Sequence, residues 1–224
     1  MSELRIALTI TTLTPLSVGA GSSSGSRADK SVIRDGYGRP IIPGSQLKGK
    51  VRHAAEALVQ GLGMPSQSHF DDDASPTNCI RQLFGSPQVR SPLRFADLTA
   101  RLGDLFTPVQ NRQMLSQLRP SVAISRRRGT AEDERLLLQE TVPQGLVFSA
   151  DDAISGHLGA DELPAVALLW AALKFSPRWG GAKSRGLGWA SIAPQIFWNG
   201  QSQPLRDGVL AEALRQLPKQ KGAQ

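Results

Sequence analysis

The stretch Val32-Ile-Arg-Asp-Gly-Tyr-Gly-Arg-Pro-Ile-Ile42 runs directly into Pro43-Gly-Ser-Gln-Leu-Lys-Gly-Lys-Val-Arg52, and together they indicate the fold. The first has apolar ends around Gly-Tyr-Gly, which predicts two short strands joined by a glycine turn. The second begins a helix that should end between Gly61 and Pro65, with Ser45 as its N-cap. The apolar stripe of this helix consists of Leu47, Val51, Ala54, Ala55 and Leu58.

Strands and helices interleave on both sides of this unit. Alternating apolar residues from Leu4 to Ile10 predict an opening strand with one buried face. The apolar run 163–175 predicts a helix that covers the sheet, and a strand should follow at residues 187–192. Further strands are expected at residues 93–98, 121–125, 136–141 and 145–150, the last two paired across Pro143. This order favours an α+β, ferredoxin-like antiparallel sheet over a doubly wound parallel sheet.

The chain has 224 residues, of which 40% are hydrophobic, so it is long enough to bury a core. We expect one domain over residues 1–200, with insertions at about 62–92 and 125–138. Residues 66–78 are polar and acidic without periodicity, and we interpret them as a mobile part of the first insertion. Residues 201–224 should form a short helix and a basic tail.

The charge balance indicates a polyanionic partner. Lys and Arg number 26 against 19 Asp and Glu, which gives a net charge of +7 and a pI near 10.2. Nucleic acid is the first candidate and an anionic membrane surface the second. The chain starts without a secretory signal pattern, and its longest apolar run is shorter than the roughly 20 residues that span a bilayer. We therefore expect a cytoplasmic protein without a membrane partner.

Two glycine-bearing basic segments suggest how a phosphodiester chain would be held. One is the helix start quoted above, where Lys48 and Arg52 lie one turn apart near free N–H groups. The other is Trp179-Gly-Gly-Ala-Lys-Ser-Arg-Gly-Leu-Gly188, with four glycines in ten residues. Exposed amides beside cations suit phosphate oxygens, so both segments are interpreted as parts of one RNA-binding surface. The alternatives are a solvated helix face for the first segment and a tight connection for the second. Trp179 could stack on a base or cap the sheet, and we expect it to cap the sheet.

The front segment also has the spacing of a nucleotide-binding P-loop, G-x-x-x-x-G-K, over residues 44–50. A P-loop needs Ser or Thr next to hold magnesium, whereas this chain has Val51. The helical periodicity also runs through the supposed loop. We therefore exclude an NTPase site.

The ordered combination of these pieces resembles the RAMP superfamily, the repeat-associated proteins of CRISPR systems, over about residues 3–193. The matching phrases are Thr14-Pro-Leu-Ser-Val-Gly-Ala-Gly21, Ala28-Asp-Lys-Ser-Val-Ile-Arg-Asp35, Arg39-Pro-Ile-Ile-Pro-Gly-Ser-Gln-Leu-Lys-Gly49 and Gly180-Gly-Ala-Lys-Ser-Arg-Gly-Leu-Gly188. The resemblance implies a modified RNA-recognition fold with helices on one face. It also implies copies stacked along a guide RNA in a type III effector complex, and a thumb that interrupts the guide–target duplex.

The resemblance implies the partners and the binding residues as well. The partners are guide RNA, target RNA, other RAMP subunits and the large subunit of the complex. The thumb is expected in the charged stretch 126–135. The expected RNA-binding residues are Ser45, Lys48, Lys50, Arg52, Arg126, Arg127, Gly180, Gly181, Lys183, Ser184 and Arg185. The cysteine cluster of some relatives is reduced to Cys79, so we predict no zinc and no resident metal site.

Asp29 falls where the resemblance implies the aspartate that cleaves target RNA. A carboxylate with a pKa near about 3.9 is a poor base at neutral pH, so it would hold a divalent metal such as Mg²⁺ or orient the 2′-hydroxyl. This chain reads Gly25-Ser-Arg-Ala-Asp29, without the Gly-Gly that relatives carry before the aspartate. The alternative is an Asx-turn at Asp29, and Asp35 is interpreted as a turn residue or ion-pair partner.

Two other functions stay open at the level of sequence. The chain could be a purely structural backbone or capping subunit without catalysis. It could also be a stand-alone endoribonuclease that processes guide precursors, since such enzymes share the glycine loop. These enzymes commonly depend on a His or Tyr, and the one tyrosine here, Tyr37, falls in the hairpin turn.

Overall fold

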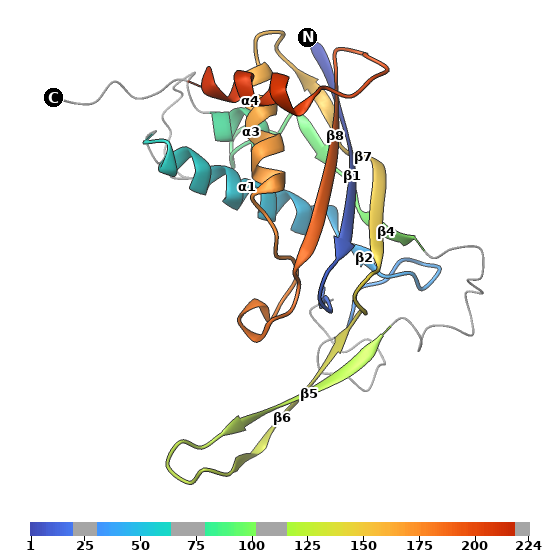
Figure 1. Ribbon diagram of the computed structural model, residues 1–224, viewed down its shortest axis with the longest axis vertical. Helices are drawn as coiled ribbons and strands as arrows, with labels where there is room; N and C mark the ends of the chain where they lie inside the picture. The colour runs from blue at the N-terminus through green and yellow to red at the C-terminus, as the bar shows by residue number, and fades with distance from the viewer. Residues whose placement is uncertain (20–30, 64–78, 102–115, 218–224) are drawn as a thin grey trace, which may run out of the picture.

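The computed structural model describes residues 1–19, 31–63, 79–101 and 116–217. One antiparallel sheet has the strand order β2-β4-β7-β1-β8, and β3 also pairs with β7. Its strands are β1 Ser2–Thr12, β2 Ile41–Ile42, β3 Leu93–Phe95, β4 Leu98–Arg101, β7 Val147–Leu158 and β8 Ala190–Trp198. The helices α1 Gly44–Gly61, α3 Leu163–Lys174 and α4 Asp207–Arg215 lie on one face of the sheet (Figure 1). The predicted α+β antiparallel architecture is confirmed.

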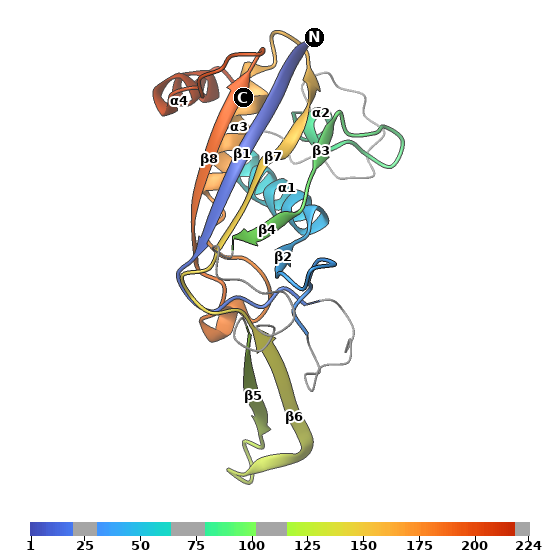
Figure 2. The same ribbon diagram turned by 90° about the vertical axis from the view of Figure 1, so that its right-hand side faces the viewer.

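The predicted opening strand forms the middle of the sheet. β1 pairs with β7 on one side and β8 on the other, and Ile6 lies opposite both Ile154 and Ile196. Its alternating apolar side chains are at most 1% exposed and face the helices. Figure 2 shows the other face of these three strands, which none of the described helices covers. The hydrophobic core therefore lies in a single layer between the sheet and the helices.

The two long helices follow the predicted pattern. α3 is the predicted helix at 163–175, and its residues 165–169 are all buried. α1 buries Leu47, Val51, Ala54 and Ala55 as expected, whereas Leu58 is only partly buried and Val59 is buried instead. Its N-cap is Pro43 rather than Ser45, which is exposed. The first N–H of α1, from Gly44, donates a hydrogen bond of 2.8 Å to Asp97 Oδ1. The prediction of a Ser45 cap is wrong because a carboxylate from the β3–β4 connection already occupies the helix start.

A second, two-stranded sheet projects from the end of the main sheet (Figure 1). It consists of β5 Gln117–Ile124 and β6 Ala131–Thr141, so part of the expected loop 126–135 is strand. The predicted pairing of residues 136–141 with 145–150 is wrong, because β6 pairs with β5. The N–H of Leu146 instead donates to Thr12 Oγ1, which directs the chain into β7 beside β1.

Two further strand expectations need adjustment, and one expectation cannot be compared with the described residues. The single strand predicted at 93–98 is two strands, β3 and β4, separated by the capping residue Asp97. The strand predicted from residue 187 begins at Ala190. The predicted mobile stretch 66–78 lies outside the described residues, and the described remainder of that insertion includes α2 Cys79–Phe84. The helix expected in the tail is α4. In the described ranges, no helix has the length and apolarity needed to cross a membrane.

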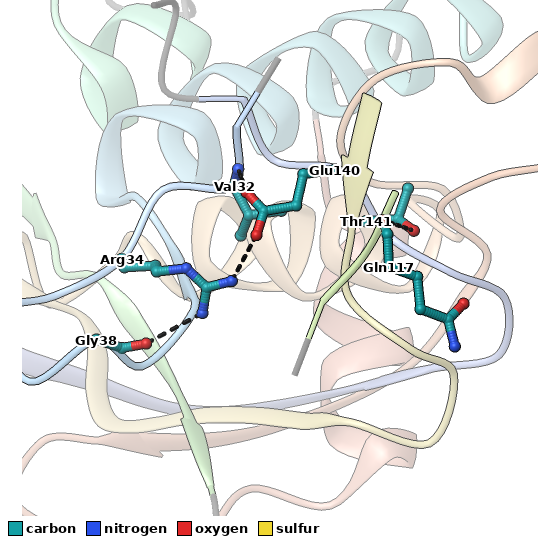
Figure 3. Close-up of polar contacts among 6 residues, drawn as sticks. All are labelled: Val32, Arg34, Gly38, Gln117, Glu140 and Thr141. Atoms are coloured by element: carbon teal, nitrogen blue, oxygen red, sulfur yellow. Dashed lines mark hydrogen bonds and ion pairs between the residues drawn. The ribbon is translucent and has the colours of Figure 1, made fainter. Parts of the chain in front are cut away.

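A buried carboxylate anchors the root of the β5–β6 hairpin (Figure 3). Glu140 is 8% exposed, and its Oε2 accepts a hydrogen bond of 2.7 Å from the Val32 N–H. Its Oε1 lies 2.7 Å from Arg34 Nη2, and Arg34 also donates to the Gly38 carbonyl. One carboxylate thereby ties the segment from Val32 to Gly38 to strand β6.

The charge of Glu140 is stabilised by its neighbours. Burial opposes ionisation, but the hydrogen bonds that the carboxylate accepts outweigh burial and hold its pKa below the ordinary value of 4.5. The donors are the Ser116 side chain, the Val32 N–H and the Arg34 guanidinium. A carboxyl whose pKa is lowered on folding stabilises the fold above its unfolded pKa, and the stabilisation is lost as the pH falls through the folded pKa.

We therefore expect Glu140→Gln to lower the free energy of unfolding at pH 7 by roughly 2–3 kcal/mol, because the partly buried guanidinium of Arg34 then lacks its anion. Urea titrations at several pH values should show the gap from wild type closing as the pH falls below 4.5. Glu132→Gln, an exposed change on the same strand, is the matched control. A gap that stays constant down to about pH 3 would contradict the role of the carboxylate charge.

The contact between α1 and the β3–β4 connection gives a second prediction. A Cβ on Gly44 would overlap the Phe95 carbonyl, whereas a Cβ on Gly49, in the same helix, would meet nothing within 4 Å. We expect Gly44→Ala to destabilise the protein by about 1–3 kcal/mol through overpacking. Gly49→Ala should stabilise it by about 0.5–1 kcal/mol, since alanine loses less backbone entropy in a helix. Equal denaturation midpoints for the two variants would contradict the close approach.

Candidate functional site

The start of α1 and the loop between α3 and β8 meet around a surface pocket of about 340 Å³. These are the two glycine-bearing basic segments, which lie far apart in the sequence. Figures 1 and 2 both show this loop at the end of the sheet from which the β5–β6 hairpin projects. The pocket is lined by Gln46, Gly49, Lys50 and His53 from α1 and by Trp179, Gly180 and Lys183 from the loop.

The loop is held rigidly by its own backbone. Trp179 is fully buried, and its N–H donates a hydrogen bond of 2.7 Å to the Gly188 carbonyl, which closes the neck of the loop. The Gly181 N–H donates to the Ser17 carbonyl at 2.8 Å. Gly180 and Gly188 have positive φ, and a Cβ on either would overlap backbone carbonyls. These two glycines therefore serve the fold of the loop itself.

The tip of the loop presents cations to solvent. Lys183–Arg185 forms a 3₁₀ turn between two residues in the left-handed conformation, Ala182 and Gly186. All three side chains of the turn, including that of Ser184, are exposed. Gly186 has open space around it. The turn can therefore approach a polyanion without rearrangement of the loop neck.

Two lysines line the pocket, and the charge of Arg178 acts on one of them, Lys50. Partial burial lowers the pKa of Lys50, and the neighbouring charges of Lys183 and Arg178 lower it further. Among the described residues, neither Lys50 nor Lys183 has an ion-pair partner within 4.0 Å. The guanidinium carbon of Arg178 lies 5.0 Å from the centre of the Trp189 ring. Like charges that converge without an anion favour binding of an external anion.

Lys48 and Arg52 lie on the other side of α1 from the pocket. Lys48 Nζ lies 5.8 Å from the centre of the Phe95 ring, and burial and the Arg52 charge lower its pKa. Arg52 Nε forms an ion pair of 2.9 Å with Glu56. The expected RNA-binding residues of α1 are thus divided: Lys50 faces the loop, whereas Lys48 and Arg52 face the α2 and β3 side.

The other expected site residues lie away from the pocket or outside the described residues. Arg126 and Arg127 are exposed in the turn at the far end of the β5–β6 hairpin. Asp29 lies outside the described residues. The bridge between Gly19 and Val32 closes the ends of the segment that contains it, and Glu140 binds Val32 from the hairpin root.

Asp35 is a turn residue, as the sequence indicated. Its Oδ1 accepts hydrogen bonds from the Tyr37 and Arg39 N–H groups, and its Oδ2 lies 2.7 Å from Arg39 Nε. In the part of the chain that is described, no three His, Cys, Asp or Glu side chains gather as a metal site would require. The carboxylates of Asp35, Asp97 and Glu140 all have structural partners.

Sequence reasoning missed two residues of the pocket wall on α1. Gln46 and His53 flank Lys50 at i−4 and i+3, the spacing that places residues on one helix face. This spacing was visible in the sequence. Trp179, by contrast, is buried as the capping interpretation predicted.

Comparison with known proteins agrees with this architecture. A stretch of 91 residues, 39% of this chain and 40% of the relative, is 41% identical to the CRISPR system Cms endoribonuclease Csm3 of Enterococcus italicus. The protein of the same name from Mycobacterium tuberculosis is 37% identical over 90 residues, which cover 39% of this chain and 37% of the relative. The one from Methanocaldococcus jannaschii is 27% identical over 206 residues, 84% of this chain and 80% of the relative. The matches to the first two relatives thus span less than half of their length.

The family match is more extensive than the matches to the first two relatives. The model of the RAMP superfamily matches residues 9–191, from the central strand β1 to the start of β8. It therefore includes both walls of the pocket and the whole β5–β6 hairpin. On this match the chain belongs to the RAMP superfamily.

Proposed function

We propose that this chain is a guide-RNA-binding, filament-forming subunit of a type III CRISPR interference complex. The observation that carries the proposal is the meeting of Lys50 and Lys183, from two distant segments, on the wall of one pocket. Membership of the RAMP superfamily and the names of the three relatives support it. In this proposal the chain also cleaves, or helps to cleave, complementary target RNA with Asp29.

The pocket suits the sugar–phosphate backbone rather than particular bases. Ammonium groups make strong, undirected contacts with phosphate oxygens, and such contacts position a strand without reading its sequence. The exposed turn Lys183–Arg185 extends the positive surface beyond the pocket. A subunit that holds guides of any sequence needs this kind of contact.

The β5–β6 hairpin is the proposed thumb. It projects from the same end of the sheet as the pocket and carries Arg126 and Arg127 at its turn (Figure 1). Its strands also expose four large apolar side chains, each about half exposed or more: Leu118, Val122, Ile124 and Leu136. Apolar surface of this kind is stabilised when it is covered by bases of a distorted duplex or by a neighbouring subunit. Other RAMP subunits and the large subunit of the complex are the proposed protein partners.

In the proposed chemistry at Asp29, the target's own 2′-hydroxyl loses its proton and attacks the adjacent phosphorus. The bond from phosphorus to the 5′-oxygen of the next nucleotide breaks, which leaves a 2′,3′-cyclic phosphate and a protonated 5′-hydroxyl. Asp29 would orient that hydroxyl or bind a Mg²⁺ ion together with phosphate oxygens of the RNA. In this proposal, phosphate oxygens of the RNA would complete the ligands of the ion beside Asp29. A stand-alone processing enzyme finds less support, since Tyr37 lies exposed in the hairpin turn.

The binding proposal predicts that Lys50→Ala and Lys183→Ala each weaken binding of single-stranded RNA by about tenfold, since each removes one charge-assisted phosphate contact. Fluorescence anisotropy across a salt series is the measurement. The log–log slope should fall by about 0.7 for each phosphate that is no longer neutralised. Lys174→Ala removes the same charge from an ion pair with Asp207 on the α3–α4 side and should leave affinity nearly unchanged. Equal reductions of affinity for all three variants would point to net charge alone.

The catalytic part of the proposal has a separate test. In the assembled complex, Asp29→Ala should abolish cleavage of target RNA at the position of this subunit while guide RNA still co-purifies. Asp161→Ala, at an exposed loop position, is the control. An unchanged cleavage ladder with Asp29→Ala would contradict catalysis here and leave the structural, non-catalytic function.

A further inference from the structure

Two polar atoms at the pocket lack hydrogen-bond partners although they are shielded from solvent. Within the described ranges these are the acceptor Gln46 Oε1 and the donor Trp179 Nε1, and both residues line the pocket. Leaving a buried polar group unpaired costs about 1–3 kcal/mol, so such groups are rare in folded proteins. Trp179 is fully buried, whereas Gln46 is partly buried on the pocket wall, so a ligand in the pocket that carries a hydrogen-bond donor can pair with Gln46 Oε1.

The chemistry of the orphan acceptor narrows the ligand. An ionised phosphate has no proton to donate, so the phosphate that Lys50 and Lys183 would bind leaves Gln46 Oε1 unpaired. The sugar–phosphate backbone has one hydroxyl that donates a hydrogen bond, the ribose 2′-hydroxyl, and DNA lacks it. Lys50 follows Gln46 by one helical turn, so the two side chains lie on the same face of α1 and can contact neighbouring groups of one nucleotide.

We infer that Gln46 is a specificity-determining residue that accepts a hydrogen bond from a ribose 2′-hydroxyl, so that this pocket distinguishes RNA from DNA. The inference rests on the proposed function, because it assumes that the pocket holds a nucleic-acid backbone. Gln46 is only partly buried, so its terminal amide can turn toward the pocket without movement of α1. The volume of about 340 Å³ accommodates a sugar–phosphate unit.

The test compares RNA and DNA binding by the full-length chain. Fluorescence anisotropy would measure the Kd of a labelled single-stranded oligonucleotide of about 20 nucleotides as RNA, as DNA of the same sequence, and as 2′-O-methyl RNA. In the wild type, RNA should bind about 3–10-fold more tightly than the other two, which lack the 2′ donor. Gln46→Leu should raise the Kd for RNA by that factor and leave the Kd for DNA unchanged. Gln60→Leu, at the other end of α1, should change neither.

The outcomes separate this inference from the function on which it rests. If Gln46→Leu weakens RNA and DNA equally, or neither, or if wild type binds 2′-O-methyl RNA as tightly as RNA, the assignment of Gln46 is wrong. The comparison with 2′-O-methyl RNA needs no variant and decides the point even if Gln46→Leu fails to fold. If Lys50→Ala and Lys183→Ala leave binding unchanged, the proposed backbone site itself fails, whatever Gln46 does.

Discussion

The closed neck of the glycine loop is the constraint on which the rest of the site depends. The buried Trp179 indole fixes the loop in the core, while the Trp179 N–H bonds to the Gly188 carbonyl across the neck. This approach leaves no space for a side chain on Gly188, and the next contact, at Gly180, is similarly close to Ser17. Because the loop is fixed at these points, Lys183 is held opposite Lys50 instead of moving away from it. A flexible linker of the same composition would let the two ammonium groups separate and relieve their repulsion.

Like charges held close together lower the stability of the unliganded fold, and they favour binding of an anion. Elsewhere in the described chain, several charges near one another are compensated: Arg34 by Glu140, Arg39 by Asp35 and Arg52 by Glu56. Lys50 differs from these pairs, because burial lowers its pKa and the neighbouring charges of Lys183 and Arg178 lower it further. A bound polyanion would compensate these charges, and the relief of their repulsion would add to the free energy of binding. The helix start, by contrast, already has its anion in Asp97, which makes it a weaker seat for phosphate than its sequence suggested.

The periodic elements could be predicted from sequence because their burial is local: alternation indicated β1, and apolar stripes indicated α1 and α3. What could not be predicted depends on contacts between distant residues. Residues 147–150 pair with β1, where the Leu146 N–H donates a hydrogen bond to Thr12 Oγ1. No local sequence pattern predicts this pairing. The glycines of the second basic segment were interpreted as RNA contacts, yet Gly180 and Gly188 are required by backbone packing. The meeting of the two basic segments was predicted from their chemistry, but the side of α1 that faces the loop was not.

The root of the β5–β6 hairpin is hydrogen-bonded both to Val32 and to the residues that support the glycine loop. Glu140 lies on β6, yet its carboxylate binds the backbone of Val32, at the exit of the segment that contains Asp29. The bridge from Val142 to Leu16 then connects the same root to the residues that support the glycine loop through Ser17. Hydrogen bonds therefore connect the hairpin root both to Val32 and, through Leu16 and Ser17, to the glycine loop. If the hairpin is the proposed thumb, these bonds hold it in a fixed position relative to a strand bound at the pocket, because both would contact the same nucleic acid.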